Sequence, residues 1–284
     1  MKTILVPTDF SEYANNALLA AFDIALKNKA KLVLMHTVEV SSGAFITPSG
    51  MSADNSIIDG ELMLHFTENA KRKLEELIQN YQHFQNVSVE YVVEIGKLFP
   101  SVIEVIRELN INLVVMGSKG KDGLDELLIG SNTEKMVRTA PCPVLAIKGG
   151  VQAANFRHIV FATNLEEDQL LATKKLKEFQ ALFDAKVYLL RVNTPTDFMT
   201  TLEANQRFVE YIEKYQLSNC ESHLYCDLDQ DNGILHFSQA IGADLIALAT
   251  NQRRGLSHLF LGSIAEDVVN QAQRPVLTFN NKTL

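Results

Sequence analysis

The chain carries one pattern twice, and this duplication limits the fold more than any other feature. The opening stretch "KTILVPTDFSEYANNALLAAFDIAL" matches "RHIVFATNLEEDQLLATKKLKEF", which begins at Arg157. The stretch "INLVVMGSKGKDGLDELLIGSNTEKMVRTAPCPVLAIK" matches the later "ADLIALATNQRRGLSHLFLGSIAEDVVNQAQRPVLTFN". The aligned pairs are Gly123 and Gly255, Gly130 and Gly262, Ser131 and Ser263, and Pro143 and Pro275. Such a repeat indicates a tandem duplication. We therefore predict one domain over residues 1–150 and a second over 151–284, with the linker near residues 149–156.

Short apolar strands alternate with helices in each half. In the first half we expect strands at residues 4–7, 31–37, 87–95, 113–117 and 144–148, and helices at 11–29, 60–81, 100–109 and 131–139. Strands that are apolar throughout indicate a parallel sheet with helices on both faces. Each half is therefore predicted to be a doubly wound α/β domain. Ligands of such domains bind beyond the carboxyl ends of the strands, and the polar stretch 41–56 is expected to form a mobile loop or lid over that edge.

Composition narrows the class of protein. A net charge of −8 disfavours binding to nucleic acid through a basic surface. There is no apolar run of about 18 residues, which a membrane span would need, and no apolar leader of the secretory kind. The expectation is a cytoplasmic protein without a nucleic-acid or membrane partner.

The three cysteines, Cys142, Cys220 and Cys226, give neither a disulfide framework nor a paired zinc signature. Reduced thiols are the expectation. His223 and Cys226 would share one face of a helix, but "CESHLYCDL" alternates like a strand and places them on opposite faces. The sequence therefore predicts no metal site there.

Three glycines follow the fourth expected strand with the spacing G-x2-G-x9-G-S. Gly117 and Gly120 leave the strand without side chains, so backbone N–H groups can approach a ligand there. Gly130 and Ser131 open the next helix, whose free N–H groups and dipole favour an anion such as phosphate. Lys119 and Lys121 can offset phosphate charge. The loop is predicted to hold phosphate, although the glycines can also serve only to shape turns.

Two common nucleotide motifs are absent from the sequence. The chain has no G-x4-G-K-[ST] loop and no G-x-G-x-x-G fingerprint. Neither a P-loop nor a Rossmann dinucleotide site is therefore expected.

The glycine motif, together with "LVPTDFSE" at the start and "TAPCPVLAIK" before the linker, resembles the universal stress protein family. Because both repeats share the outline, the resemblance covers essentially the whole chain. It implies an adenine-nucleotide-binding fold in which each half has a five-stranded, mainly parallel sheet. It also implies ATP as the ligand, with or without Mg²⁺, and pairing of the two halves through their last strands as a pseudo-dimer. Whether two chains form a homodimer stays open.

The resemblance implies a nucleotide site at three strand ends and one helix start. Its residues are Pro7, Thr8, Asp9, Val38, Met116, Gly117, Gly120, Gly130, Ser131 and Asn132. Asp9 would lie against the adenosine, and the backbone at Val38 would face the adenine. The family more often has Val, Ile or Thr where this chain has Asn132. Asp9 can instead cap the helix expected from residue 11, and His36 fits a satisfied core histidine better than a ligand contact.

The second half departs from the motif. Asn164 stands where the first half has Asp9, Ala249 replaces the first glycine, and Gln252 replaces the second. Gly262 and Ser263 are retained, so a helix start is expected to survive there. The sequence predicts one competent ATP site, in the first half, and a degenerate one in the second. Arg253 and Arg254 are interpreted there as a solvated loop, the alternative being that they attract an anion.

Three functional hypotheses remain at this point. The first is a cytoplasmic stress-response protein in which ATP binding shifts conformation or partners. The second is an enzyme, a slow ATPase or a phosphoryl or nucleotidyl transferase, for which Asp122, Asp125 and Glu126 are the carboxylates at hand. The third is an interaction scaffold that needs no nucleotide.

Overall fold

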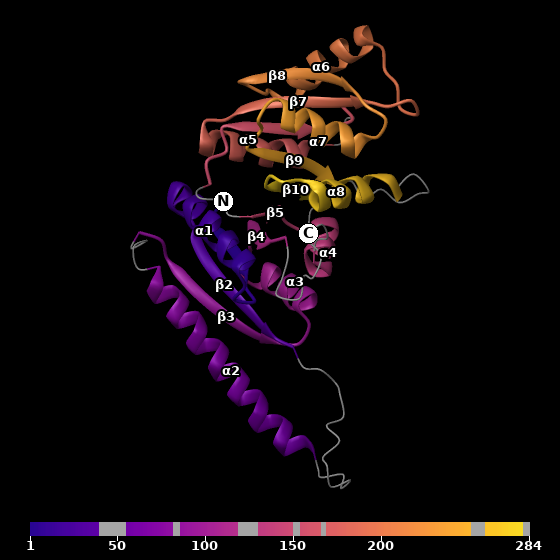
Figure 1. The fold of residues 1–284 in the computed structure, drawn as a ribbon. Helices are drawn as coiled ribbons and strands as arrows, with labels where there is room; N and C mark the ends of the chain where they lie inside the picture. Colours follow the sequence, from indigo (N-terminus) through magenta and orange to yellow (C-terminus); the bar gives the residue numbers. More distant parts are fainter. Residues whose placement is uncertain are drawn as a thin grey trace.

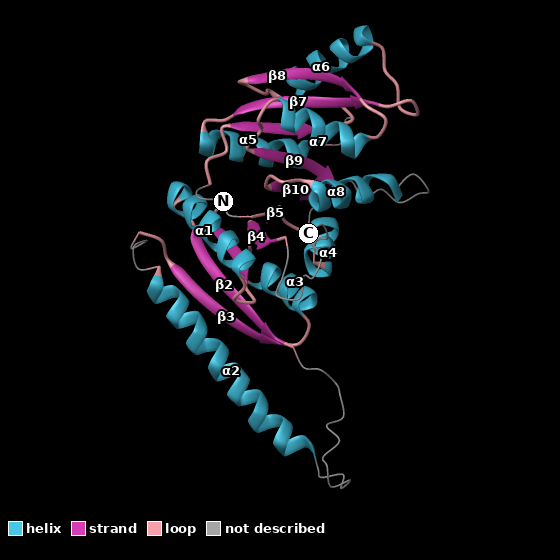
Figure 2. Ribbon diagram, in the orientation of Figure 1, coloured by secondary structure: helices cyan, strands magenta, loops and turns pink. Residues whose placement is uncertain are grey.

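A computed structural model describes residues 1–39, 55–81, 86–118, 130–149, 154–165, 169–250 and 259–280. Within these ranges, ten strands form one continuous sheet that runs through both halves, with helices on both faces (Figures 1 and 2). The predicted fold class, α/β with a mainly parallel sheet, is confirmed. Five strands come from each half, and they join into a single sheet rather than two separate ones.

The elements alternate as the sequence predicts. In the first half they are β1 (Thr3–Pro7), α1 (Glu12–Asn28), β2 (Lys31–Val38), α2 (Asn55–Asn80), β3 (Val89–Ile95), α3 (Leu98–Glu108), β4 (Leu113–Gly117), α4 (Ser131–Thr139) and β5 (Val144–Ile147). In the second half they are β6 (His158–Ala162), α5 (Leu170–Phe183), β7 (Lys186–Asn193), α6 (Thr201–Tyr215), β8 (Cys220–Cys226), α7 (Gln230–Ala240), β9 (Leu245–Thr250), α8 (Leu259–Gln271) and β10 (Val276–Asn280). The largest difference in the first half is α2, which begins at Asn55 instead of residue 60.

The two halves meet edge to edge. The strand order is β3-β2-β1-β4-β5-β10-β9-β6-β7-β8. Both halves have the same strand order, and the second half runs along the sheet in the opposite direction from the first. All neighbouring strands run parallel except β5 and β10, which pair antiparallel with Leu145 opposite Leu277. The expected pairing through the last strand of each half is therefore present in the fold.

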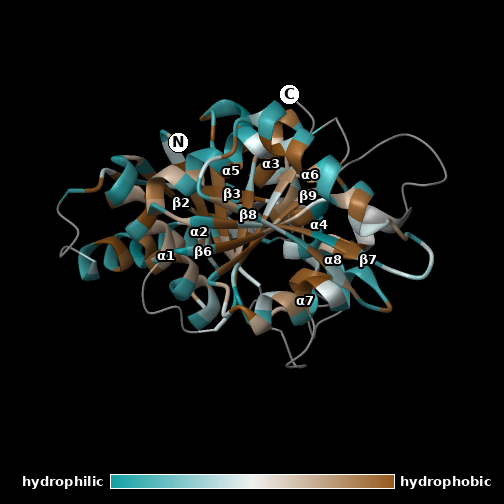
Figure 3. Ribbon diagram, turned by 90° about the horizontal axis from the view of Figure 1, so that it is seen from above, coloured by the Kyte–Doolittle hydropathy of each residue, from teal (hydrophilic) through white to brown (hydrophobic). Residues whose placement is uncertain are grey.

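Each face of the sheet carries one hydrophobic core that extends through both halves. Helices α1, α2, α5 and α6 pack on one face, where Phe22, Phe161 and Phe279 are almost fully buried. Helices α3, α4, α7 and α8 pack on the other, around residues such as Met136 and Val268. Figure 3 shows the apolar residues gathered along the central strands between these layers. Continuous apolar strands fit this double coverage.

Local sequence sets the ends of α1. Ser11 accepts a hydrogen bond from the Ala14 N–H at 3.2 Å and caps the first turn. Lys29 closes the helix in the left-handed conformation, and its N–H bonds to the Ala25 carbonyl. The buried face of α1 is largely alanine, which lets the helix lie close to the sheet.

The end of the expected linker is packed against both halves. The Ala154 N–H donates to the Asp23 carboxylate of α1 at 2.8 Å, and the Phe156 ring contacts the Phe183 ring of α5 with centroids 4.9 Å apart. The predicted boundary between residues 150 and 151 lies outside the described residues and stays a prediction. No helix in the described part of the chain is both long and apolar enough to cross a bilayer.

Candidate functional site

The candidate site of the first half lies where β1, β2 and β4 end and α4 begins. The Gly130 N–H donates to the Ser118 carbonyl at 2.9 Å, and the Thr133 hydroxyl donates to the Gly117 carbonyl at 3.0 Å. These two bonds hold the start of α4 against the end of β4. Because β4 lies beside β1, the same contacts place Gly130 at the edge of the sheet where Asp9 lies.

In the described part of the chain, the N-terminus of α4 has no side-chain cap. Gly130 is its N-cap with φ −64° and ψ 141°, and no side chain of the described residues caps it. Ser131 is exposed, and Asn132 is partly exposed. The first N–H groups of a helix have no partner within the helix, so they point at an anion if one is present. Because Gly130 has no side chain, the N-cap residue itself does not cover these N–H groups.

Gly117 is required by packing inside the protein. A Cβ atom at Gly117 would lie 2.8 Å from the backbone carbonyl carbon and oxygen of Tyr13 in the first turn of α1. The glycine therefore lets α1 approach β4, which is a different reason from the ligand approach expected from the sequence. Ser118, which follows, is 1% exposed, and its hydroxyl has no partner among the described residues.

The end of β1 is a tight polar turn. The Thr8 hydroxyl accepts from the Phe10 N–H at 3.0 Å, and the Asp9 carboxylate accepts from the Ser11 N–H at 3.0 Å. Phe10 has a φ of 63°, so the chain turns sharply here. The alternative that Asp9 caps α1 is thereby corrected, because Ser11 is the cap and Asp9 orders the turn before it.

Two residues outside the predicted set support this turn. Nδ1 of His36 lies 2.7 Å from the Thr8 carbonyl oxygen, and the His36 ring contacts Phe10 with centroids 4.7 Å apart. The ammonium of Lys73 on α2 lies 5.4 Å from the centre of the Phe10 ring. His36 is thus hydrogen-bonded within the fold, as the sequence suggested, and it fixes the backbone beside Asp9.

Of the remaining predicted residues that the structure describes, Pro7 and Val38 lie at the carboxyl ends of their strands and Met116 lies in the core. Val38 ends β2, is 8% exposed, and its carbonyl accepts from the Gly96 N–H at 3.0 Å. Met116 is 5% exposed and its side chain lies in the core. Pro7 is the last residue of β1. Gly120, the neighbouring Lys119 and Lys121, the three loop carboxylates and most of the expected lid lie outside the described residues.

The second half keeps the turn but changes the crevice. The Thr163 hydroxyl accepts from the Leu165 N–H at 3.0 Å, and Leu165 has a φ of 62°, as at Thr8 and Phe10. However, α8 begins at Leu259, so Gly262 and Ser263 lie inside the helix. An amide bonds to the carbonyl four residues earlier in an α-helix, which places the Ser263 N–H opposite the Leu259 carbonyl. The expectation that a free helix start survives at Gly262 is wrong.

Polar residues that the sequence analysis did not select fill this second crevice. Gln169 is 3% exposed, and its side-chain oxygen accepts from the Thr163 hydroxyl at 2.6 Å and from the Tyr211 hydroxyl at 2.8 Å. Arg191 is 4% exposed and pairs with Asp197 at 2.6 Å. A charged residue within the apolar strand "KVYLLRVN" was the signal that could have identified Arg191.

The cysteines and histidines form no evident metal centre in the described part of the chain. Cys142, Cys220 and Cys226 are free thiols. Burial raises the pKa of the Cys142 thiol to about 12 and that of Cys220 to about 11. Strand β8 contains both His223 and Cys226, as the alternation predicted.

Comparisons with known proteins agree with the fold and the repeat. The model of the universal stress protein family matches residues 1–148 and again residues 155–280. Universal stress protein MJ0577 of Methanocaldococcus jannaschii is 27% identical over 154 residues, which cover 52% of this chain and 94% of that relative. A putative universal stress protein of Staphylococcus aureus is 29% identical over 171 residues, covering 58% of this chain and 95% of that relative.

Solved structures also match the whole chain. The crystal structure of a universal stress protein from Archaeoglobus fulgidus aligns over 99% of this chain and 98% of its own, with a TM-score of 0.76 at 19% identity. At that identity the likeness concerns the fold, and it extends to the tandem arrangement of the halves.

Proposed function

Because this chain belongs to the universal stress protein family, we propose that its first half binds one adenine nucleotide, ATP, at the carboxyl edge of β1, β2 and β4. Binding there would shift the conformation of the chain or its choice of partners in a cytoplasmic stress response. The observation that carries the proposal is the N-terminus of α4, which no described side chain caps and which the bond from the Gly130 N–H to the Ser118 carbonyl holds against the end of β4.

The geometry supports separate contacts for the phosphates, the adenosine and the adenine within the proposed site. The N–H groups at Ser131 and Asn132 would bind phosphate oxygens, with the positive end of the helix dipole behind them. The turn at Pro7, Thr8 and Asp9 would lie against the adenosine. Its backbone is fixed by the bonds from the Thr8 and Asp9 side chains and by His36. Val38 at the end of β2 would border the adenine.

The second half serves in this proposal as a scaffold and not as a nucleotide site. Its helix start does not present Gly262 and Ser263 as an open N-terminus. Asn164 also lacks the negative charge of Asp9. The loop carboxylates Asp122, Asp125 and Glu126 lie outside the described residues, so the proposal stops at binding and does not extend to hydrolysis.

The test is a calorimetric titration of ATP, with and without Mg²⁺, into protein free of co-purified nucleotide. The variants are Gly130→Val and Gly262→Ala. Valine adopts the extended backbone of Gly130 without strain, and it places a side chain over the open amides. We expect one site in the wild type, an affinity at least about tenfold weaker in Gly130→Val, equivalent to losing one or two charge-assisted hydrogen bonds, and no change in Gly262→Ala.

Two results would contradict the proposal. No heat with nucleotide-free wild type would remove ATP binding altogether. Equal losses in the two glycine variants would show that the open start of α4 is not the phosphate site. Steady ATP turnover that Asp9→Ala abolishes would instead favour the enzyme hypothesis.

A further inference from the structure

Three large apolar side chains are exposed at one end of the second half. Phe198 lies in the loop after β7, Leu202 in the first turn of α6, and Leu228 in the loop after β8 (Figure 1). They are 71%, 82% and 76% exposed, more than any other large apolar side chain in the described part of the chain. Single exposed apolar residues are common on proteins, but a group of them marks a contact surface. We call these three residues the apolar patch.

Asn193 at the end of β7 holds the two loops of the patch together. It is 3% exposed, and its side-chain amide donates to the Met199 carbonyl at 2.8 Å while its side-chain oxygen accepts from the Met199 N–H at 3.1 Å. Its backbone carbonyl accepts from the Asp227 N–H at 3.0 Å. Met199 follows Phe198, and Asp227 precedes Leu228. One buried residue thus brings both loops, and the side chains that they expose, to the same place.

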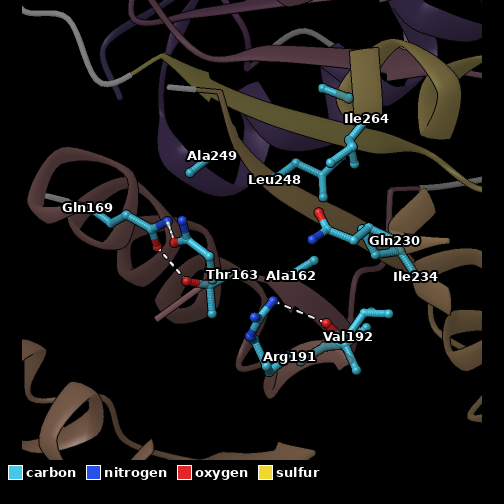
Figure 4. A pocket seen from close by; sticks show the side chains of 13 residues that line it. Ala162, Thr163, Gln169, Arg191, Val192, Gln230, Ile234, Leu248, Ala249 and Ile264 are labelled. Atoms are coloured by element: carbon cyan, nitrogen blue, oxygen red, sulfur yellow. Dashed lines mark hydrogen bonds between the residues drawn. The ribbon is translucent and has the colours of Figure 1, made fainter. Parts of the chain in front are cut away.

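A buried arginine fixes the first of these loops from within the fold. Arg191 is 4% exposed, and its Nη2 lies 2.6 Å from Oδ1 of Asp197, the residue before Phe198. Its Nη1 donates to the Val192 carbonyl at 3.1 Å (Figure 4). The Gln230 side-chain amide, from the first turn of α7, donates to the other carboxylate oxygen of Asp197 at 2.9 Å. The loop that carries Phe198 is therefore tied to both β7 and α7.

The backbone under the third patch residue is also ordered. The Thr200 hydroxyl accepts from the Glu203 N–H at 3.2 Å and caps the turn of α6 that contains Leu202. All three patch residues thus project from hydrogen-bonded backbone. A surface that is ordered before it binds loses less conformational entropy on binding. This arrangement favours a docking surface.

Acidic residues outnumber basic ones around the apolar patch. The two segments that carry it, residues 194–210 and 226–236, contain one lysine or arginine, Arg207, which lies 2.8 Å from Glu203. Their acidic residues are Asp197, Glu203, Glu210, Asp227, Asp229 and Asp231. The rim of the patch therefore carries net negative charge.

Asp229 and Asp231 leave this negative charge beside Leu228. Asp229 accepts from the Asn232 side-chain amide at 3.4 Å, and Asp231 accepts from that of Gln271 at 3.4 Å. Neither contact supplies a positive charge. A partner that brings lysine or arginine to this rim would be attracted, whereas an anionic lipid surface or the same patch on a second copy would be repelled. The charge therefore favours a basic partner.

We propose that the apolar patch docks a short basic segment of a partner protein, in which leucine or aromatic side chains lie among lysine or arginine. The apolar side chains would cover Phe198, Leu202 and Leu228, and the basic ones would face Asp229 and Asp231. The surface belongs to the second half and needs no nucleotide in the first, so it goes beyond the function proposed above and does not depend on it.

Three synthetic peptides of equal length test the two properties of this surface. One is made of leucine and lysine in amphipathic helical order, the second has glutamate in place of lysine, and the third has serine in place of leucine. Each is titrated into the full chain while NMR follows the methyl signals of Leu202 and Leu228, with those of Leu64, an exposed leucine of α2, as reference. We expect saturable shifts at Leu202 and Leu228 with the leucine–lysine peptide. The other two lose the charge attraction or the apolar contact, so each should bind at least about tenfold more weakly.

A matched pair of double variants locates the binding. Phe198→Ser with Leu228→Ser should weaken binding of the leucine–lysine peptide at least about tenfold. Phe66→Ser with Leu64→Ser, at exposed positions of α2, should leave it unchanged. Because these side chains are exposed, neither change removes a core contact. The wild-type series needs no variant, so a misfolded variant does not decide the outcome.

The acidic rim is tested separately. Asp229→Asn with Asp231→Asn should weaken the leucine–lysine peptide about threefold, as expected for charges at an exposed rim. Absent or non-saturable shifts, equal losses in the two serine variants, or equally tight binding of the leucine–glutamate peptide would overturn the proposal. So would a dimer in sedimentation, or binding to phosphatidylcholine vesicles, that Phe198→Ser with Leu228→Ser abolishes, because the patch would then serve a second copy or a membrane.

Discussion

At the scale of single residues, two glycines of the first-half motif, Gly117 and Gly130, lie in different surroundings. Gly130 has backbone angles that other residues also adopt, so its conformation alone does not require glycine, and in the proposed site it keeps the N-cap free of a side chain. Gly117 instead lies so close to Tyr13 that any side chain would meet backbone atoms of α1. In the second half Ala249 stands at the position of Gly117. The neighbouring helix α5 begins at Leu170, later than α1 does in the first half. The first-half motif thus combines a packing requirement at Gly117 with a proposed ligand contact at Gly130.

Gly117→Ala should destabilise the first half. The added Cβ would lie 2.8 Å from the Tyr13 backbone, so α1 or β4 must shift. We expect the free energy of unfolding to fall by about 1–3 kcal/mol, as for other overpacked sites, measured by urea denaturation. Gly60→Ala on α2 is the control, because a Cβ there meets nothing within 4 Å. It should be neutral or stabilising by up to about 1 kcal/mol. Equal effects of both changes would contradict the packing role.

The spacing of these glycines could be recognised from the sequence. The physical reason why each position needs glycine could not. The contact between Gly117 and Tyr13 depends on how closely an alanine-rich helix lies on the sheet. The pair of Arg191 and Asp197 depends on a turn that follows β7. The first contact is decided by tertiary packing and the second by a local turn, and neither leaves a periodic signal in the sequence.

At the scale of elements, the two halves hold their helices differently. In the second half Tyr211 of α6 donates to Gln169 at 2.8 Å and lies 3.0 Å from the Thr173 hydroxyl of α5. Burial raises the pKa of Tyr211 to about 12, so its hydroxyl keeps its proton even in alkaline solution where an exposed tyrosine would ionise. In the first half the positions equivalent to Gln169 and Thr173 are Ala14 and Leu18, which are apolar. A polar network therefore joins α5 to α6.

Tyr211→Phe should loosen this network. The change leaves the ring in place and removes the hydroxyl that donates to Gln169. We expect a loss of about 1–2 kcal/mol in the free energy of unfolding, because a buried acceptor loses a partner. Tyr225→Phe is the control, since Tyr225 contacts the Phe237 ring on the opposite face of the sheet. A loss no larger than that of the control would show that the network does not stabilise the chain.

The elements themselves were largely predictable because their patterns are local. Apolar strands and the start of α4 at Ser131 follow from nearby sequence, whereas the cap of α1 is Ser11 and not Asp9, the cap considered from the sequence. The start of α8 did not follow, because the prediction copied the helix start of the first half onto Gly262. The residues before Gly262, "LFL", are apolar like the aligned "LLI" before Gly130, so this pattern alone does not distinguish the two helix starts.

At the scale of the whole molecule, the halves share one sheet and both cores. Beside the pairing of β5 and β10, helices α4 and α8 pack together, and Arg138 of α4 lies 3.6 Å from Glu266 of α8. Burial raises the pKa of Glu266 above its ordinary value, Arg138 opposes this rise, and Glu134 and Asp267 add to it. Helix α4 therefore both carries the proposed phosphate site at its N-terminus and contacts the second half through α8.

Glu266→Gln should stabilise the chain at neutral pH. Since the folded-state pKa of Glu266 is raised, the folded chain binds its proton more tightly than the unfolded chain. Stability is then lost as pH rises from the ordinary value, 4.5, through the raised one. The melting temperature of the variant should exceed that of the wild type at pH 7, and the difference should shrink near pH 4. Glu76→Gln, at an exposed pair on α2, should show neither effect.

A lower melting temperature of Glu266→Gln at pH 7 would contradict this account. It would mean that the attraction of Arg138 exceeds the cost of burying the carboxylate. Half of the Arg138 side chain is exposed, and ion pairs of exposed residues contribute little, which is why we expect the burial to decide the sign.

The central claim is that one half of the duplicated fold holds the nucleotide and the other does not. Native mass spectrometry of the full chain, titrated with ATP after removal of any bound nucleotide, tests it most directly by counting ligands per chain. The account predicts saturation at one ATP per chain, and loss of that single adduct in Gly130→Val. Saturation at two per chain would contradict the degenerate second half, and no adduct would contradict nucleotide binding by this chain.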